Sequence, residues 1–177
     1  MNAHIFHLYN RANDRHTLFR EDDNYRFFIK KMGKQLTAAV HILGYCVMPN
    51  HFHVLVALKT PLRKDFIFGK EFYNQMPTPE LSEAVRRWLM GYTKSHNKYY
   101  GLTGSRFQQH TRATYHLVGS ASGLRYIHQN PVEAGLVVHP SEWGYSSYLE
   151  YEGLIAPEDC ICNIELGKKL LLVRDIR

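Results

Sequence analysis

The distribution of apolar side chains predicts three short β-strands in the first third of the chain. The first, HIFHLYNR over residues 4–11, is rich in aromatic and branched side chains. Two more, HILGYCVM over 41–48 and HFHVLVAL over 51–58, flank Pro49-Asn50, a dipeptide typical of a turn. We therefore expect residues 41–58 to form a β-hairpin.

Two longer segments have the three-and-four spacing of an amphipathic helix. The first begins at Asp22 and Asp23, which can cap it, and its apolar positions are Tyr25, Phe28, Ile29, Met32, Leu36, Ala39 and Val40. The second covers residues 79–100, with Thr78 as its N-cap and Gly101 directly after its last residue. Its predicted buried stripe consists of Leu81, Val85, Trp88, Leu89, Tyr92 and Tyr99.

Two further elements follow the second helix. The segment SRFQQHTRATYHLV, residues 105–118, predicts a fourth strand. Ser120 can cap a third helix, which we expect to end at Asn130 because Pro131 follows. Residues 61–79 contain three prolines and no clear period, which predicts a loop.

The resulting order, β-α-β-β-α-β-α, is typical of an α+β fold in which helices pack on an antiparallel sheet. Its first six elements match the ferredoxin-like arrangement. We expect residues 1–140 to form one domain. Residues 141–177 contain Trp143 and YSSYLEY, and this aromatic content predicts a C-terminal extension docked on that domain.

Composition and charge then narrow the class of protein. With 45% hydrophobic and 21% charged residues among 177, the chain is typical of a soluble domain. No apolar run reaches the roughly 18 residues that span a bilayer, and the N-terminus lacks a signal-peptide pattern, so we expect a cytoplasmic protein. The net charge of +6 suits a nucleic-acid partner and equally suits a merely basic enzyme. The three cysteines, Cys46, Cys160 and Cys162, predict neither a disulfide framework nor a zinc ribbon.

Two histidines in the third predicted strand are candidates for a metal site. Side chains alternate along a strand, so His51 and His53 would project from one face while Phe52 and Val54 cover the core from the other. Two neutral imidazoles at this spacing can hold one divalent cation. Because the chain has 11 histidines, roughly 0.7 such patterns arise by chance, and a packing role for both stays open.

The third predicted helix carries a possible nucleophile. Tyr126 and Asn130 are four residues apart, which places them on one face of a helix. A phenol that can attack and an amide oxygen that can bind a metal would then project together. The competing interpretation is a tyrosine at the rim of the core and an asparagine that caps the helix.

Four segments in this order resemble the HUH-type single-tyrosine transposases, and most closely the REP-associated tyrosine transposase branch. The segments read HLYNRANDRHTLF, MPNHFHVLV, LRYIHQNPVEAGLV and WGYSSYLEYEG, and the resemblance runs from about residue 4 to 153. The resemblance implies a ferredoxin-like sheet whose H-x-H strand faces a helix with a tyrosine. The chain departs from the pattern at Ala12, where relatives often have a glycine after the arginine.

The resemblance also implies roles for individual residues. His51 and His53 would be metal ligands, and Tyr126 would be the catalytic nucleophile. Asn130 would be the third ligand, with Gln129 as its competitor because relatives often have glutamine four residues after the tyrosine. Mg²⁺ or Mn²⁺ suits such a mixed nitrogen and oxygen ligand set. The implied reaction cleaves and rejoins single-stranded DNA near hairpins of the repetitive extragenic palindrome (REP) kind, through a 5′-phosphotyrosine.

Further residues near these segments could contact the DNA. Five arginines could meet phosphates, namely Arg11, Arg15, Arg106, Arg112 and Arg125. Three rings could stack on unpaired bases, namely Phe107, Tyr115 and His116. An ordinary solvated or core role is equally compatible with each of them.

The resemblance implies a cytoplasmic, nucleoid-associated DNA transposase and endonuclease whose partner is single-stranded DNA with a hairpin. A monomer and a homodimer, with the tyrosine acting in cis or in trans, both stay open. The main competing hypothesis is a non-catalytic DNA-hairpin-binding protein derived from a transposase. The residues are also compatible with a phosphoesterase that uses water as its nucleophile, and with a structural domain in which the histidines only pack.

Overall fold

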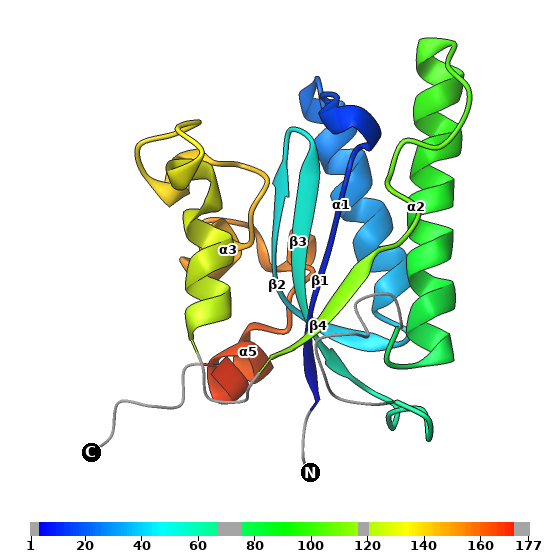
Figure 1. Cartoon of the computed structure of the whole chain (residues 1–177). Coiled ribbons are helices and arrows are strands. Elements are labelled where there is room, and N and C mark those ends of the chain that lie inside the picture. Colours follow the sequence, from blue (N-terminus) through cyan, green and yellow to red (C-terminus); the bar gives the residue numbers. More distant parts are fainter. Residues whose placement is uncertain (1–3, 67–75, 117–120, 172–177) are drawn as a thin grey trace.

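The computed structural model describes residues 4–66, 76–116 and 121–171, which form a four-stranded antiparallel sheet with helices on both faces (Figure 1). The strands are β1 (Ile5–Arg11), β2 (Val40–Met48), β3 (His51–Leu58) and β4 (Arg112–His116). Their order across the sheet is β2-β3-β1-β4, which confirms the predicted α+β, ferredoxin-like arrangement. Helices α1 (Asp22–Leu36) and α2 (Pro79–Tyr100) cover one face, and α3 (Ser122–Glu133) covers the other.

Shorter elements complete the described chain. A single turn, η1 (Asn13–Arg15), follows β1, and the segment after α3 contains η2 (Pro140–Glu142), α4 (Tyr148–Tyr151), η3 (Pro157–Asp159) and α5 (Ile164–Leu171). Ala12 keeps an ordinary φ of −61°, whereas Asp14 and Arg15 take positive φ values of 53° and 57°. The turn therefore needs no glycine at position 12, because the left-handed residues are Asp14 and Arg15.

The predicted hairpin is confirmed, with Met48 of β2 opposite His51 of β3. Side chains that alternate along β3 contribute to two separate hydrophobic cores. Phe52, Val54 and Val56 belong to the larger core under α1 and α2. Leu55 and Ala57 belong to a smaller core under α3. His51 and His53 therefore lie on the face that α3 covers.

Helix α3 approaches the sheet closely because β2 has a glycine beneath it. A Cβ added to Gly44 would lie 2.4 Å from Cδ1 of Leu124. Leu124 and Ile127 are 5% and 0% exposed, and both pack in the smaller core. Full burial of such side chains contributes about 1.5–3 kcal/mol each, so these two residues fix the helix on the sheet.

The ends of α2 match the prediction, whereas those of α1 do not. Oγ1 of Thr78 accepts a hydrogen bond from the Leu81 N–H at 3.1 Å, and Gly101 ends α2 with a φ of 64°. In α1 the predicted caps lie inside the first turn, after an N-cap residue, Glu21, whose side chain makes no capping bond. This helix ends at Leu36, and Val40, which the helical spacing included, begins β2 instead.

Pro131 does not end α3, so the expected end at Asn130 is wrong. The helix continues to Glu133, and Pro131 is buried within it. A proline ring removes one intrahelical hydrogen bond, but the next turn is still closed by the Ala134 N–H, which donates to Asn130 O at 2.9 Å. The predicted cap, Ser120, lies outside the described residues.

Two more expectations need correction. Tyr99 is 73% exposed rather than buried, because the last turn of α2 extends beyond the sheet (Figure 1). The predicted strand over 105–118 is regular only at Arg112–His116, and 117–118 lie outside the described residues. Residues 105–111 instead follow the turn after β1, where the Gln108 N–H donates to Arg11 O and the Asn13 N–H donates to Arg106 O.

The segment after residue 140 packs against β2 and α1. Trp143 Nε1–H donates to Val47 O at 3.0 Å, and the ring of Tyr145 stacks on that of Tyr25 with centroids 3.8 Å apart. Ser147 Oγ accepts from the Tyr45 N–H at 2.9 Å and lies 2.8 Å from His128 Nε2. No helix in the described part of the chain has the length and apolar character of a membrane span.

Ser147 links β2, α3 and the C-terminal segment, so its hydroxyl should matter to the stability of the whole fold. Ser147→Ala leaves the buried Tyr45 N–H and the His128 ring without this partner. We expect the free energy of unfolding, measured by urea denaturation, to fall by about 1–3 kcal/mol. Ser95→Ala is the matched control, because the exposed Ser95 hydroxyl bonds only to Gly91 O of its own helix. Equal losses in the two variants would contradict this role.

Candidate active site

The site lies on the α3 face of the sheet, where β1 and β3 run side by side. Tyr9 is opposite His53, and Arg11 is opposite His51. On the other side of β1, Arg112 of β4 is opposite Tyr9. Because paired residues share a face, alternate residues of three strands point toward α3.

A cavity of about 380 Å³ opens over these strands. It is lined by Tyr9, Asn10, Arg11, Arg15, Asn50, His51, Phe52, His53, Gln108, His110, Arg112 and Tyr126. Three of these residues are arginines, and none of the described residues that line it is aspartate or glutamate. The cavity therefore suits an anion.

Tyr126 of α3 stands over the histidines within the same chain. Its ring centroid is 5.6 Å from that of His53, and the two rings meet edge to face. The side chain of Tyr126 is 47% exposed, so its hydroxyl can be reached from the cavity. The structure thus brings together the strand histidines and the helix phenol that the sequence singled out.

His51 is held by two asparagines. Its Nδ1 lies 2.7 Å from Oδ1 of Asn50, and because a carbonyl oxygen can only accept, Nδ1–H is the donor. Burial lowers the pKa of His51, a hydrogen bond with the Asn130 side chain acts against this, and Arg11 adds to the lowering. The side chain of Asn130 therefore lies beside the His51 ring.

His53 is held by a residue that the sequence did not single out, His7 of β1. Nδ1 of His53 lies 2.9 Å from Nε2 of His7, and the two rings are stacked with centroids 5.0 Å apart. His7 is diagonal to His53 across the strand pair, because its direct partner is Leu55. Alternation within residues 4–11 places His7 and Tyr9 on one face, but the sequence does not give the register of this strand against β3.

Burial keeps both of these imidazoles neutral at pH 7. It lowers the pKa of His53 to about 3, with His7 and His51 contributing further. It lowers the pKa of His7 to about 4, with a smaller contribution from His116. A neutral imidazole is the form that can bind a metal.

The remaining candidates separate into two groups. Asn130 is 9% exposed and bonds to His51, whereas no such contact links Gln129 to the described part of the site. Arg11, Arg15 and Arg112 line the cavity, but Arg106 and Arg125 do not. Arg106 instead donates to Thr103 O at 2.6 Å, in the loop after α2.

Two of the rings near the motifs are structural. Phe107, a candidate for base stacking, is 4% exposed and packs in the larger core, so little of its ring is open to a base. His128 turns away from the site, toward Ser147 and the ring of Tyr148. Tyr115 remains 38% exposed, at the edge of Phe6.

Known proteins are similar to this chain in sequence and in fold. A curated Haemophilus influenzae protein described as a REP-associated tyrosine transposase is 30% identical over 132 residues, which cover 72% of this chain and 70% of that protein. A solved structure described as a REP-associated tyrosine transposase bound to a REP hairpin matches with a TM-score of 0.58 and 19% identity, over 92% of this chain and 87% of the other. At that identity the likeness bears on the fold alone. No family model matches the chain.

The buried neutral histidines predict that acid destabilises the fold. Burial lowers the pKa of His53 to about 3, and it lowers the pKa values of His7 and His128 to about 4. The unfolded chain, with ordinary values near 6.5, therefore binds more protons as the pH falls from 6.5 toward 4. Between pH 7 and pH 5 each such histidine should reduce the free energy of unfolding by about 2 kcal/mol.

Urea denaturation at pH 7, 6 and 5 measures this dependence. His128→Gln should make it shallower, because the variant lacks one of the groups that take up a proton on unfolding. Equal unfolding free energies at pH 7 and pH 5 would contradict the prediction.

Proposed function

Since the chain belongs to the family of REP-associated tyrosine transposases, we propose that it cleaves and rejoins single-stranded DNA beside hairpins, with Tyr126 as the nucleophile. The observation that carries this proposal is the Tyr126 phenol beside His53, over a cavity lined with arginines. A protein that only bound hairpins would have no use for an exposed phenol held over two neutral imidazoles. Because all these groups come from one chain, the geometry supports cleavage in cis.

In the proposed reaction the Tyr126 oxygen attacks a backbone phosphorus and forms a new P–O bond. The bond from phosphorus to the 3′ oxygen breaks, the 3′ oxygen takes up a proton, and the phenol loses one. The 5′-phosphate then remains on the tyrosine as a phosphodiester. Because the number of phosphodiester bonds is conserved, a 3′-hydroxyl can later attack the phosphotyrosine and reseal a strand without a nucleotide cofactor.

The site residues fit a divalent cation, Mg²⁺ or Mn²⁺, held by His51, His53 and Asn130. With Nδ1 of His51 occupied by Asn50 and Nδ1 of His53 occupied by His7, each ring has Nε2 left for a ligand. The side chain of Asn130 lies beside the His51 ring, so its amide oxygen can join Nε2 of both histidines around one cation. A bound cation would polarise a phosphate oxygen and offset the charge that develops during attack.

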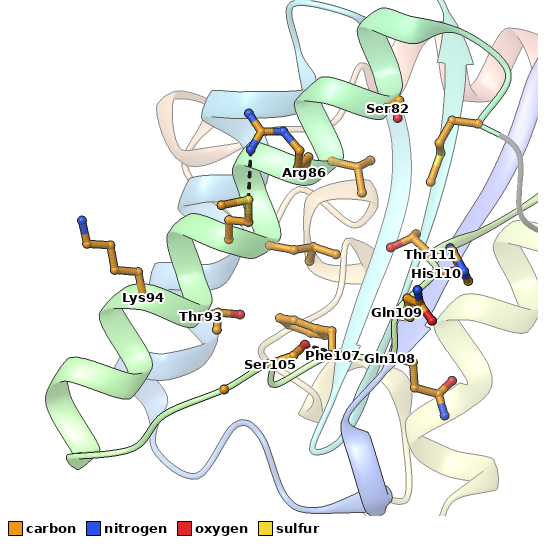
Figure 2. Close-up of a pocket in the computed structure, with 15 residues that line it drawn as sticks. Ser82, Arg86, Thr93, Lys94, Ser105, Phe107, Gln108, Gln109, His110 and Thr111 are labelled. Atoms are coloured by element: carbon orange, nitrogen blue, oxygen red, sulfur yellow. Dashed lines mark hydrogen bonds between the residues drawn. The ribbon is translucent and has the colours of Figure 1, made fainter.

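A second cavity supports single-stranded DNA as the substrate. Figure 2 shows it between α2 and residues 104–111, with a volume of about 520 Å³. Gln108 and His110 line both cavities, which are therefore adjacent. Val85, Leu89 and Phe107 form an apolar part, and Lys94 provides positive charge. Arg86 also lines the cavity, but it is ion-paired with Glu83.

The lining charges separate these two cavities from others on the molecule. Neither has an acidic residue among the described residues that line it. By contrast, three other cavities contain acidic residues. The first has Glu21 and Asp23, the second has Asp14, and the third has Glu80 and Glu83. A strand that leaves Tyr126 along β4 would thus meet two adjacent cavities whose described lining residues include no carboxylate, which favours binding of a polyanion.

Tyr126→Phe tests the function directly. Wild-type protein incubated with Mn²⁺ and a hairpin-bearing single strand should form a covalent adduct that survives denaturing electrophoresis, and chelation by EDTA should prevent it. The Phe variant should form no adduct, because the nucleophilic oxygen is gone, yet it should bind the hairpin with unchanged affinity.

Tyr99→Phe is the control, because this tyrosine is exposed on α2 away from the cavity. An adduct that persists in Tyr126→Phe would rule out this nucleophile. Cleavage without an adduct in that variant would favour water as the nucleophile, and wild-type binding without any adduct would favour a non-catalytic hairpin binder.

Lys94→Ala tests the second cavity as part of the DNA path. Loss of one contact to the phosphates of a single strand should weaken binding about fivefold at 0.1 M salt and reduce the salt slope by about 0.7. The effect should appear with a hairpin that carries unpaired extensions and not with a blunt hairpin. Fluorescence anisotropy without metal measures both affinities.

Lys34→Ala is matched in charge and lies on α1 beside Glu80 and Glu83. It should leave both affinities unchanged. Equal losses for the two lysines, or an equal loss for both DNAs, would show that Lys94 contributes only to the general positive field.

A further inference from the structure

The position of His7 beside His53 has a chemical consequence for the site. We propose that His7 is a positioning residue: it accepts the Nδ1 proton of His53 and so directs the Nε2 lone pair of His53 toward the cation. This inference rests on the proposed metal site and names a group in it that neither the sequence motifs nor the resemblance assigned.

The contact is short and its setting is rigid. Nε2 of His7 and Nδ1 of His53 are 2.9 Å apart, which is hydrogen-bonding distance for two ring nitrogens. The planes of the two rings are inclined by 30°, and the ring of Tyr9 lies 5.2 Å from that of His7. Both histidines project from adjacent central strands of the sheet, so the backbone fixes the distance between them.

The two nitrogens must share one proton, and there are two ways to do so. If His7 donates, His53 uses its Nδ1 lone pair and carries its own proton on Nε2, where it cannot bind a metal. If His53 donates, its Nε2 lone pair is free. Binding of a cation by His53 therefore selects the second arrangement, in which His7 carries its proton on Nδ1 and accepts at Nε2.

His51 offers a comparison within the same site. Its Nδ1–H donates to the Asn50 oxygen, which can only accept, so its tautomer is fixed by chemistry alone. His53 has a partner that can both donate and accept. Metal-binding histidines generally donate their second N–H to an acceptor that orients the ring, and loss of that acceptor typically weakens metal binding 10–100-fold.

Metal titration of the full chain without DNA tests the proposal. Calorimetry with Mn²⁺ at pH 7.5 should show that His7→Leu, which fills the space but cannot accept, binds about 10–100-fold more weakly than wild type. His7→Gln keeps an acceptor at a similar reach and should remain within about threefold of wild type. Thermal melting of each metal-free variant separates a loss of affinity from a loss of fold.

His41→Leu is the control, because this histidine of β2 pairs with Ala57 and is not among the described residues that line the cavity. It should bind Mn²⁺ like wild type. If His7→Leu binds Mn²⁺ as tightly as wild type, or if His7→Gln is as weak as His7→Leu while both stay folded, His7 acts only by packing and the proposal fails.

Nitrogen NMR gives a readout that packing would not affect. With Zn²⁺ as a diamagnetic probe, two-bond proton–nitrogen spectra should show His53 protonated on Nδ1 and His7 protonated on Nδ1. A proton on Nε2 of His53, or a wild-type chain that binds no metal, would overturn the proposal. Metal binding that depends on His7 without any covalent DNA adduct would instead overturn the proposed function and leave this inference intact.

Discussion

The close contact between α3 and β2 at Gly44 determines the geometry of the candidate site. A side chain at this position would collide with Leu124, which together with Ile127 fixes the helix on the sheet. Those two apolar residues set the rotation of α3 about its axis. Tyr126 then reaches the edge of the His53 ring, and Asn130, one turn later, reaches His51. The positions of Tyr126 and Asn130 in the polar site thus depend on the apolar contact between α3 and β2.

The C-terminal segment strengthens the same contact from outside. Ser147 joins the Tyr45 backbone of β2 to His128 of α3, while Trp143 donates to Val47 farther along β2. Helix α3 is therefore held against the sheet by Leu124 and Ile127 and against this segment by His128, and Tyr126 projects over the cavity. A helix clamped in this way can present a reactive group with little freedom to turn, which is what an in-line attack on phosphorus requires.

The sequence predicts what depends on local periodicity. The faces of β3 follow from strict alternation, and the ends of α2 follow from Thr78 and Gly101, so both agree with the structure. What the sequence did not predict depends on partners distant along the chain. Pro131 is kept within α3 by burial and by the next turn, and Phe107 is drawn into the core by α1 and β3. His7 could not be assigned, because the predicted strand order does not give the register between β1 and β3.

The absence of carboxylates among the described residues that line the cavity has a consequence for the order of binding. Two imidazoles and one amide carry no formal charge, so they would leave both positive charges of a bound cation undiminished. The neighbouring arginines would repel that cation until a phosphate entered between them. Under the proposed function, metal and DNA would then each raise the affinity of the other. Such mutual dependence would confine strand breakage to moments when a suitable strand is in place.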